Sequence, residues 1–193
     1  TLESRKGTQR RAKVKFEILE ETKINELEGD RVLSAEVSFL ISHVLLDNNA
    51  RSAAFGASSY LNVSSHPEVS VKTGTTNDRR DNWTIGYTPD LVVGVWAGNT
   101  SHEAMRNVTG LTGAAPIWAQ TMRSLLIGQP AQPFTQPEGL VQVEICALSG
   151  LLPTPACPYR KQEWFIDRTK PTQNDSFWQQ MQIDRETGEL ADD

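Results

Sequence analysis

The chain has 193 residues, of which 38% are apolar and 22% are charged. That length and balance fit one globular domain, alone or with an extension, and exclude disorder throughout the chain. The 19 Lys and Arg residues against 24 Asp and Glu give a net charge of −5. A mildly acidic chain argues against a broad basic surface for nucleic acid.

Neither a membrane span nor a metal site is indicated by the sequence. Apolar runs are a few residues long, against the ~20 that a spanning helix needs. His43, His66 and His102 lie far apart and lack partners at ligand spacing, so we expect no zinc site and no cofactor. The chain has no initiator methionine and opens in polar sequence, which we interpret as a piece of a longer protein.

The N-terminal segment combines a basic stretch with a short strand pattern. Residues 1–15 are polar and basic, which is typical of a solvated terminus; contact with an anionic surface is the alternative. Val14, Phe16 and Ile18 alternate with charged residues and predict a strand with one buried face. Residues 20–31 are acidic and predict a turn with an exposed return.

A first helix is predicted behind Ser34, which is a favourable N-cap residue. Apolar side chains then recur at i, i+3, i+4, i+7 and i+8, a spacing that indicates an amphipathic helix of about 14 residues. These side chains are Val37, Leu40, Ile41, Val44 and Leu45. The helix should end near Asn48 and Asn49, and a loop rich in Ala, Ser and Gly should follow up to Pro67.

Three strand-like segments follow in quick succession, at residues 68–75, 83–88 and 91–97. A polar loop at 76–82 and a tight turn at 88–90 join them, so they should form an antiparallel meander. The third segment is apolar almost throughout. We therefore expect it to lie inside the sheet and to be covered on both faces.

A second helix should start at Pro116, in the favoured first turn, and stop at Gly128. Its apolar stripe comprises Trp118, Met122, Leu125 and Leu126. The aromatic side chains Trp83, Trp96 and Trp118 are expected in the core rather than as platforms for a ligand.

The remaining sequence predicts a linker and a small appended unit. Residues 129–138 are rich in Pro and Gln and are interpreted as a linker, and residues 139–193 as a C-terminal extension. The extension contains an alternating strand at 141–145 and a hairpin-like turn at 183–190. Taken together, the elements predict an α+β fold in which helices flank an antiparallel sheet.

One short motif carries chemistry, the tetrapeptide Lys72-Thr73-Gly74-Thr75 at the end of a predicted strand. It offers a cation, two hydroxyls and an unobstructed backbone N–H, a set that can bind a carboxylate and place one donor at an oxyanion. Gly74 has no side chain to block a substrate that lies along the strand. Taken alone, the tetrapeptide also fits a surface strand that ends in a turn.

The sequence around this motif resembles the transpeptidase domain of penicillin-binding proteins, most closely the bifunctional class A type. The resemblance lies in residues 71–99, in Asp47-Asn-Asn-Ala-Arg51 with Phe55-Gly56, and in Gly110-Leu-Thr-Gly-Ala-Ala-Pro-Ile-Trp118. It implies that residues 1–128 are the C-terminal part of such a domain, with the partial fold shared by these transpeptidases and serine β-lactamases.

The chemistry of this family is acyl transfer by an active serine, which attacks a D-Ala carbonyl of a peptidoglycan stem peptide. The resemblance implies that Lys72 supplies positive potential to the site and to the substrate carboxylate. It also implies that the Thr73 and Thr75 hydroxyls bind that carboxylate and that the Thr75 N–H is one oxyanion donor. The implied ligands are stem peptides and β-lactams, and the implied location is the extracytoplasmic side of the bacterial membrane, in the periplasm or cell wall.

Two of the three family motifs are missing, since the chain contains no Ser-x-x-Lys and no Ser-x-Asn. We therefore expect a C-terminal portion of a D,D-transpeptidase that is inactive alone, because a nucleophile and its base act as a unit. The missing N-terminal part of the domain, and any membrane anchor, would lie upstream. The alternatives are a D,D-carboxypeptidase or serine β-lactamase-like hydrolase, and a non-catalytic module that binds cell wall.

The loop after the motif and the two cysteines allow more than one interpretation. Asn77, Asp78, Arg80 and Asp81 either shape substrate access at the rim of the site or pair with one another. Cys146 and Cys157 fit a disulfide and two buried thiols equally well by sequence, and the extracytoplasmic location implied by the resemblance favours the disulfide. The sheet edge that carries Lys72 should lie open, which predicts association through that edge.

Overall fold

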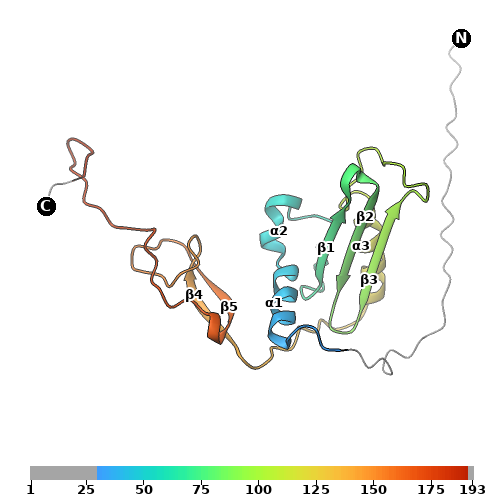
Figure 1. Cartoon of the computed structure of the whole chain (residues 1–193), viewed down its shortest axis with the longest axis horizontal. Coiled ribbons are helices and arrows are strands. Elements are labelled where there is room, and N and C mark those ends of the chain that lie inside the picture. The colour runs from blue at the N-terminus through green and yellow to red at the C-terminus, as the bar shows by residue number, and fades with distance from the viewer. Residues whose placement is uncertain (1–29, 191–193) are drawn as a thin grey trace, which may run out of the picture. The chain divides into compact units, whose positions relative to one another are not determined.

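The computed structural model describes residues 30–190, and its described residues from Leu33 onward belong to one compact unit. The basic segment 1–15, the strand predicted at 14–18 and all but the end of the acidic segment 20–31 lie outside the described residues. The α-helices and strands of the described residues are α1 (Ala35–Leu46), α2 (Asn48–Phe55), β1 (Ser70–Thr75), β2 (Asp81–Tyr87), β3 (Val92–Gly98), α3 (Ala114–Leu126), β4 (Leu140–Cys146) and β5 (Arg160–Ile166). The predicted α+β class, with helices and antiparallel strands, is confirmed (Figure 1).

Strands β1, β2 and β3 form an antiparallel sheet in that order, which confirms the predicted meander. Helix α3 packs against β2 and β3, and α1 lies beside β1 (Figure 1). The prediction that the third strand is internal and covered on both faces is wrong. In the described sheet β3 is an edge strand, and its side chains alternate, so that Val93 is buried whereas Val92 is 68% exposed.

The first helix begins as predicted but ends earlier. The Ser34 hydroxyl accepts a hydrogen bond from the Val37 N–H and caps α1. The helix ends at Leu46, and the Asp47 carboxylate then accepts a hydrogen bond from the Ala50 N–H and caps a second helix, α2. The loop predicted from residue 49 is therefore helical up to Phe55, because Asp47 serves both as the end of one helix and as the cap of the next.

The core lies between α3 and the sheet. Trp118 and Met122 of α3 are fully buried against Leu61, Val63 and strand residues, which confirms the predicted stripe at these positions. Leu125 was predicted in the same stripe, yet it is 51% exposed. It lies in the last turn of α3, seven residues beyond Trp118 and on nearly the same face, so the helix face that it occupies does not account for its exposure.

The two other tryptophans predicted in the core are at the surface. Trp83 is 44% exposed and Trp96 is 40% exposed, and the two lie opposite each other in the register of β2 and β3. The covered face of β2 carries Asn82, Thr84 and Gly86 instead. The reason is volume, since a face with small side chains accommodates the indole of Trp118, and the large side chains are left on the opposite face.

The C-terminal extension contains the two-stranded antiparallel sheet of β4 and β5. The predicted strand at 141–145 is present as β4, whereas β5 was missed because it opens with the polar run Arg160-Lys-Gln-Glu163. Cys146 and Cys157 form a disulfide that closes the segment between the strands. The predicted turn at 183–190 is closed by an antiparallel bridge between its two end residues.

The segment predicted as a linker contains no helix or strand between α3 and β4. It is held at two points, since the Gln132 N–H donates to Glu68 just before β1 and the Phe134 ring packs edge-on against Tyr87 of β2. The domain boundary at 129–138 stays a prediction. In the part of the chain that the structure describes, no helix has the length and apolar character that crossing a membrane requires.

Candidate functional site

The Lys72–Thr75 motif lies on β1, which has β2 as its only neighbour in the described sheet. The N–H of Thr76 donates to the carbonyl of Asp81 on β2. Because hydrogen-bonding direction alternates along an antiparallel strand, the N–H groups of Thr73 and Thr75 point away from β2. They are therefore directed to the open edge of the sheet, where a bound molecule can accept them.

Side chains of the motif leave the strand in two directions. Lys72 and Gly74 share the face of Ile85 and Trp83, whereas Thr73 and Thr75 share the face covered by α3. Lys72 is exposed, and its ammonium donates to the Thr73 carbonyl at 2.6 Å. The Lys72 ammonium therefore lies next to the Thr73 backbone, although Lys72 is on the opposite face of the strand from the Thr73 and Thr75 hydroxyls.

An apolar hollow of about 310 Å³ lies beside the motif, between β1 and the helices α1 and α2. Its polar lining residues are Arg51, Lys72 and Thr73, and the others are apolar, with Val44 and Phe55 among them. The open strand edge therefore borders a cavity with mainly apolar walls, an arrangement that is typical of a ligand site.

The turn that leads into α3 forms hydrogen bonds with β1 and β2 beside the motif. The sequence did not reveal this feature. The Gly110 N–H donates to the Thr75 hydroxyl oxygen at 3.0 Å, and the buried Thr84 hydroxyl donates to the Gly110 carbonyl at 3.2 Å. A Cβ at Gly110 would lie 2.9 Å from the Gly74 carbonyl oxygen. Only glycine allows this close approach of the turn to the strand.

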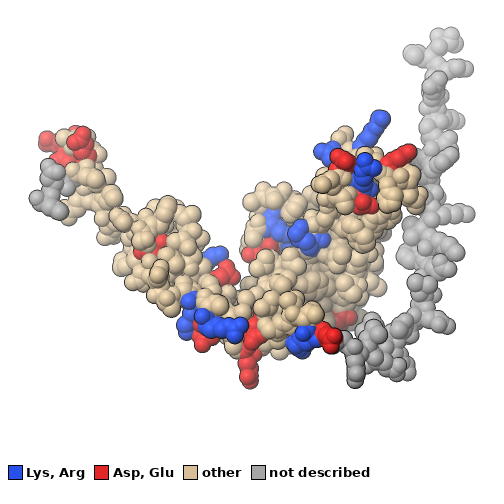
Figure 2. Space-filling view, in the orientation of Figure 1, with Lys and Arg blue, Asp and Glu red and all other residues tan. Residues whose placement is uncertain are grey.

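The loop after the motif is held by its own side chains. Asp78 and Arg80 form an exposed ion pair at 3.7 Å, and Arg80 also donates to the His102 carbonyl. Asp81 accepts hydrogen bonds from Trp96 and Thr76. Acidic and basic side chains accordingly lie side by side at this end of the sheet (Figure 2). These contacts fit the pairing interpretation, and a role for Asn77 and its neighbours as a site rim stays a prediction.

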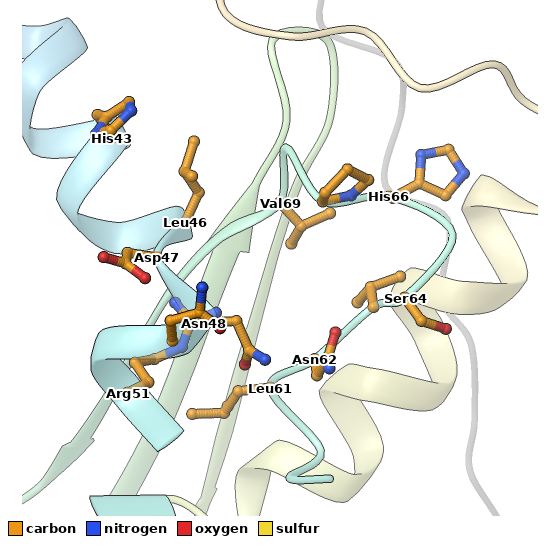
Figure 3. A pocket seen from close by; sticks show the side chains of 13 residues that line it. His43, Leu46, Asp47, Asn48, Arg51, Leu61, Asn62, Ser64, His66 and Val69 are labelled. Atoms are coloured by element: carbon orange, nitrogen blue, oxygen red, sulfur yellow. The ribbon is translucent and has the colours of Figure 1, made fainter. Parts of the chain in front are cut away.

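A second hollow, of about 280 Å³, lies between the α1–α2 junction and residues 61–69 (Figure 3). Its polar groups serve the fold: Asp47 caps α2, and the Arg51 guanidinium donates to the Leu45 carbonyl at the end of α1. Burial lowers the pKa of Arg51, and the nearby Asp47 carboxylate partly opposes that effect. We therefore interpret this hollow as part of the helix junction rather than as the site.

His66, at the rim of the same hollow, forms a buried pair with Glu68. Its Nδ1 lies 2.8 Å from the Glu68 carboxylate, and its Nε2 donates to the Leu126 carbonyl at the end of α3 at 3.2 Å. The pair therefore joins the start of β1 to the last residue of α3. Over residues 30–190, no cluster of three or more His, Cys, Asp or Glu side chains is arranged to hold a metal ion.

Comparisons with known proteins find sequence similarity to penicillin-binding proteins. Residues 136–180 match the family described as "Penicillin-binding protein 1A, C-terminal domain". "Penicillin-binding protein 1A" of Clostridium botulinum is 31% identical over 168 residues, which cover 83% of this chain and 20% of that protein. The protein of the same name from Escherichia coli is 36% identical over 121 residues, covering 55% of this chain and 14% of its own length. The findings support a C-terminal portion of a penicillin-binding protein.

The fold agrees with a solved penicillin-binding protein. The crystal structure of "Penicillin-Binding Protein 1A" from Haemophilus influenzae superposes with a TM-score of 0.63 at 29% identity. The match covers 75% of this chain and 22% of that one. The chain thus spans about a fifth of the length of this structure and of the Clostridium relative.

Proposed function

We propose that the chain is part of a peptidoglycan D,D-transpeptidase, a penicillin-binding enzyme that cross-links stem peptides through a serine acyl-enzyme. The observation that carries the proposal is the open edge of β1, where the Thr75 N–H points outward beside Lys72 and the Thr73 and Thr75 hydroxyls. The similarity to penicillin-binding proteins supports the choice of this chemistry.

Each group of the motif has a role in that reaction. The Thr75 N–H is one of the donors to the oxyanion that forms when the serine attacks the D-Ala carbonyl. The Thr73 and Thr75 hydroxyls donate to the terminal carboxylate of the stem peptide, and Lys72 supplies the positive potential that attracts it. A β-lactam presents a carbonyl and a carboxylate in a comparable arrangement, so the same groups bind it.

The serine nucleophile, its general base and the other oxyanion donor come from a part of the parent protein outside this sequence, which contains no Ser-x-x-Lys or Ser-x-Asn. The chain alone is therefore inactive. The parent acts on the extracytoplasmic side of the bacterial membrane, where stem peptides are found. A D,D-carboxypeptidase uses the same groups with water as the acceptor, and analysis of reaction products distinguishes the two enzymes.

The test is labelling of the full-length parent protein with a fluorescent penicillin. Lys72→Ala should slow labelling about 100-fold, since the substrate carboxylate loses its cationic partner. Lys170→Ala is the matched control, because Lys170 is an exposed lysine that pairs with Asp167 in the extension. Labelling of the isolated chain, or undiminished labelling of Lys72→Ala, would contradict the proposal.

A further inference from the structure

The hydroxyl of Thr75 is fixed by a short chain of hydrogen bonds that runs through Gly110 to Thr84. Thr84, fully buried on β2, donates its hydroxyl to the Gly110 carbonyl, and the Gly110 N–H donates to Thr75. The Gly110 carbonyl also accepts the N–H of Ala115 in the first turn of α3. The turn is thus fixed to both the sheet and the helix.

This arrangement determines which way the Thr75 hydroxyl is used. A hydroxyl has one proton to donate and two lone pairs that accept. Because the Gly110 N–H occupies one lone pair on the inner side of the exposed Thr75 hydroxyl, its proton cannot point toward Gly110 and is directed outward. An outward O–H donor favours an anionic acceptor, since hydrogen bonds to ionised groups are about twice as strong as those between neutral groups.

We infer that Thr84 and Gly110 are positioning residues that orient the Thr75 hydroxyl toward the substrate carboxylate. They set the preference of the site for a carboxylate over a neutral group at that position, although neither contacts the substrate. Gly110 has to be glycine for this purpose, because a Cβ would lie 2.9 Å from the Gly74 carbonyl oxygen and 3.0 Å from the Trp83 carbonyl oxygen. The inference rests on the proposed function.

The test compares two probes, benzylpenicillin and its methyl ester, on the full-length parent protein. Thr84→Val removes the hydroxyl at nearly constant volume, and it should lower the acylation rate with benzylpenicillin about three- to tenfold. The rate with the ester should change less than about twofold, so the preference for the carboxylate falls. Thr84→Ser keeps the hydroxyl and should restore the preference. Thr84→Ala, which also lacks the hydroxyl, replaces Thr84→Val if that variant does not fold.

Ser70→Ala is the matched control, because it also removes a buried hydroxyl, the one that donates to the Ser42 carbonyl, at a distance from Thr75 along β1. It should leave the ratio of the two rates unchanged. A double-mutant cycle with Thr75→Val tests whether the effect of Thr84→Val on this ratio depends on the Thr75 hydroxyl, which a purely structural role of Thr84 would not require. If Thr84 acts through Thr75, its effect on the ratio disappears in the Thr75→Val background.

The two hypotheses fail in different ways. If the wild-type parent is not acylated by benzylpenicillin, the proposed function is wrong. If the wild type is acylated and Thr84→Val slows both probes equally, or Ser70→Ala lowers the ratio as much, the positioning role of Thr84 is wrong and the proposed function stands.

Discussion

Replacement of Gly86 by alanine tests how tightly the sheet and α3 are packed. Gly86 lies on the covered face of β2, and a Cβ built there would lie 2.3 Å from Cζ2 of Trp118. Ordinary contacts of this kind are 3.4–4 Å, so the indole would have to move by more than an ångström. Trp118 is fully buried, and side chains in protein cores are close-packed, so such a movement displaces its neighbours.

Overpacking of a close-packed core typically costs about 1–3 kcal/mol. We expect Gly86→Ala at the upper end, about 3 kcal/mol, because the atoms that must shift belong to a rigid indole rather than to a flexible side chain. For a chain of this size, that loss lowers the unfolding temperature by about 6–12 °C. Differential scanning calorimetry or thermal circular dichroism of the 193-residue chain measures it.

Gly94→Ala is the matched control on the neighbouring strand, because the nearest atom to a Cβ there is Cγ1 of Ile85 at an ordinary 3.8 Å. It should leave the unfolding temperature unchanged or raise it slightly. Trp118→Leu should cost less in the Gly86→Ala background than in the wild type, because the smaller side chain makes room for the new methyl group. Equal shifts for Gly86→Ala and Gly94→Ala would refute the packing argument.

Four further predictions concern the rest of the fold. Glu68→Ala should cost about 1–3 kcal/mol in urea unfolding, because it leaves the buried Nδ1 of His66 without its hydrogen-bond partner; an unchanged free energy of unfolding would contradict this. The Cys146–Cys157 disulfide should leave no free thiol in the denatured, unreduced chain and contribute about 3 kcal/mol, whereas a count of two thiols would overturn it. Hydrogen bonds from the backbone N–H groups of Thr187 and, second in size, Glu186 lower the pKa of Asp184. The Asp184 carboxylate should therefore stabilise its turn fully above the ordinary pKa of an aspartate, and this stabilisation should disappear as the pH falls through the lowered pKa. An NMR titration of Asp184 with its midpoint at the ordinary value would argue against this prediction. The open edge of β1 should promote association, which light scattering at high protein concentration would disprove by detecting monomer alone.

Local signals in the sequence were sufficient where one residue or a regular spacing fixes the backbone. Ser34 identified the start of α1, and the short connections between the three strands identified the meander. The same reasoning missed α2, because the Asp47 cap that starts it follows directly on the preceding helix. It also missed β5, whose polar residues lack the alternation that marks a half-buried strand.

Alternation along β2 separated its side chains into two faces but did not show which face is covered. The expectation that Trp83 lies in the core chose one face, whereas the structure covers the other, with Thr84 and Gly86. That choice depends on the volume of Trp118, which comes from a helix 32 residues further along the chain than Gly86. Complementary volume is a property of two packed elements, and a single strand does not contain it.

For the candidate site, the sequence by itself determined the chemical groups: one cation, two hydroxyls and one free N–H, in the consecutive residues Lys72 to Thr75. Only the tertiary structure decided how these groups are presented. The pairing of β1 with β2 turns the Thr75 N–H outward, and a turn 35 residues away holds the Thr75 hydroxyl oxygen. Hydrogen bonds between residues so far apart depend on how the sheet and α3 pack, and no local pattern of residues specifies them.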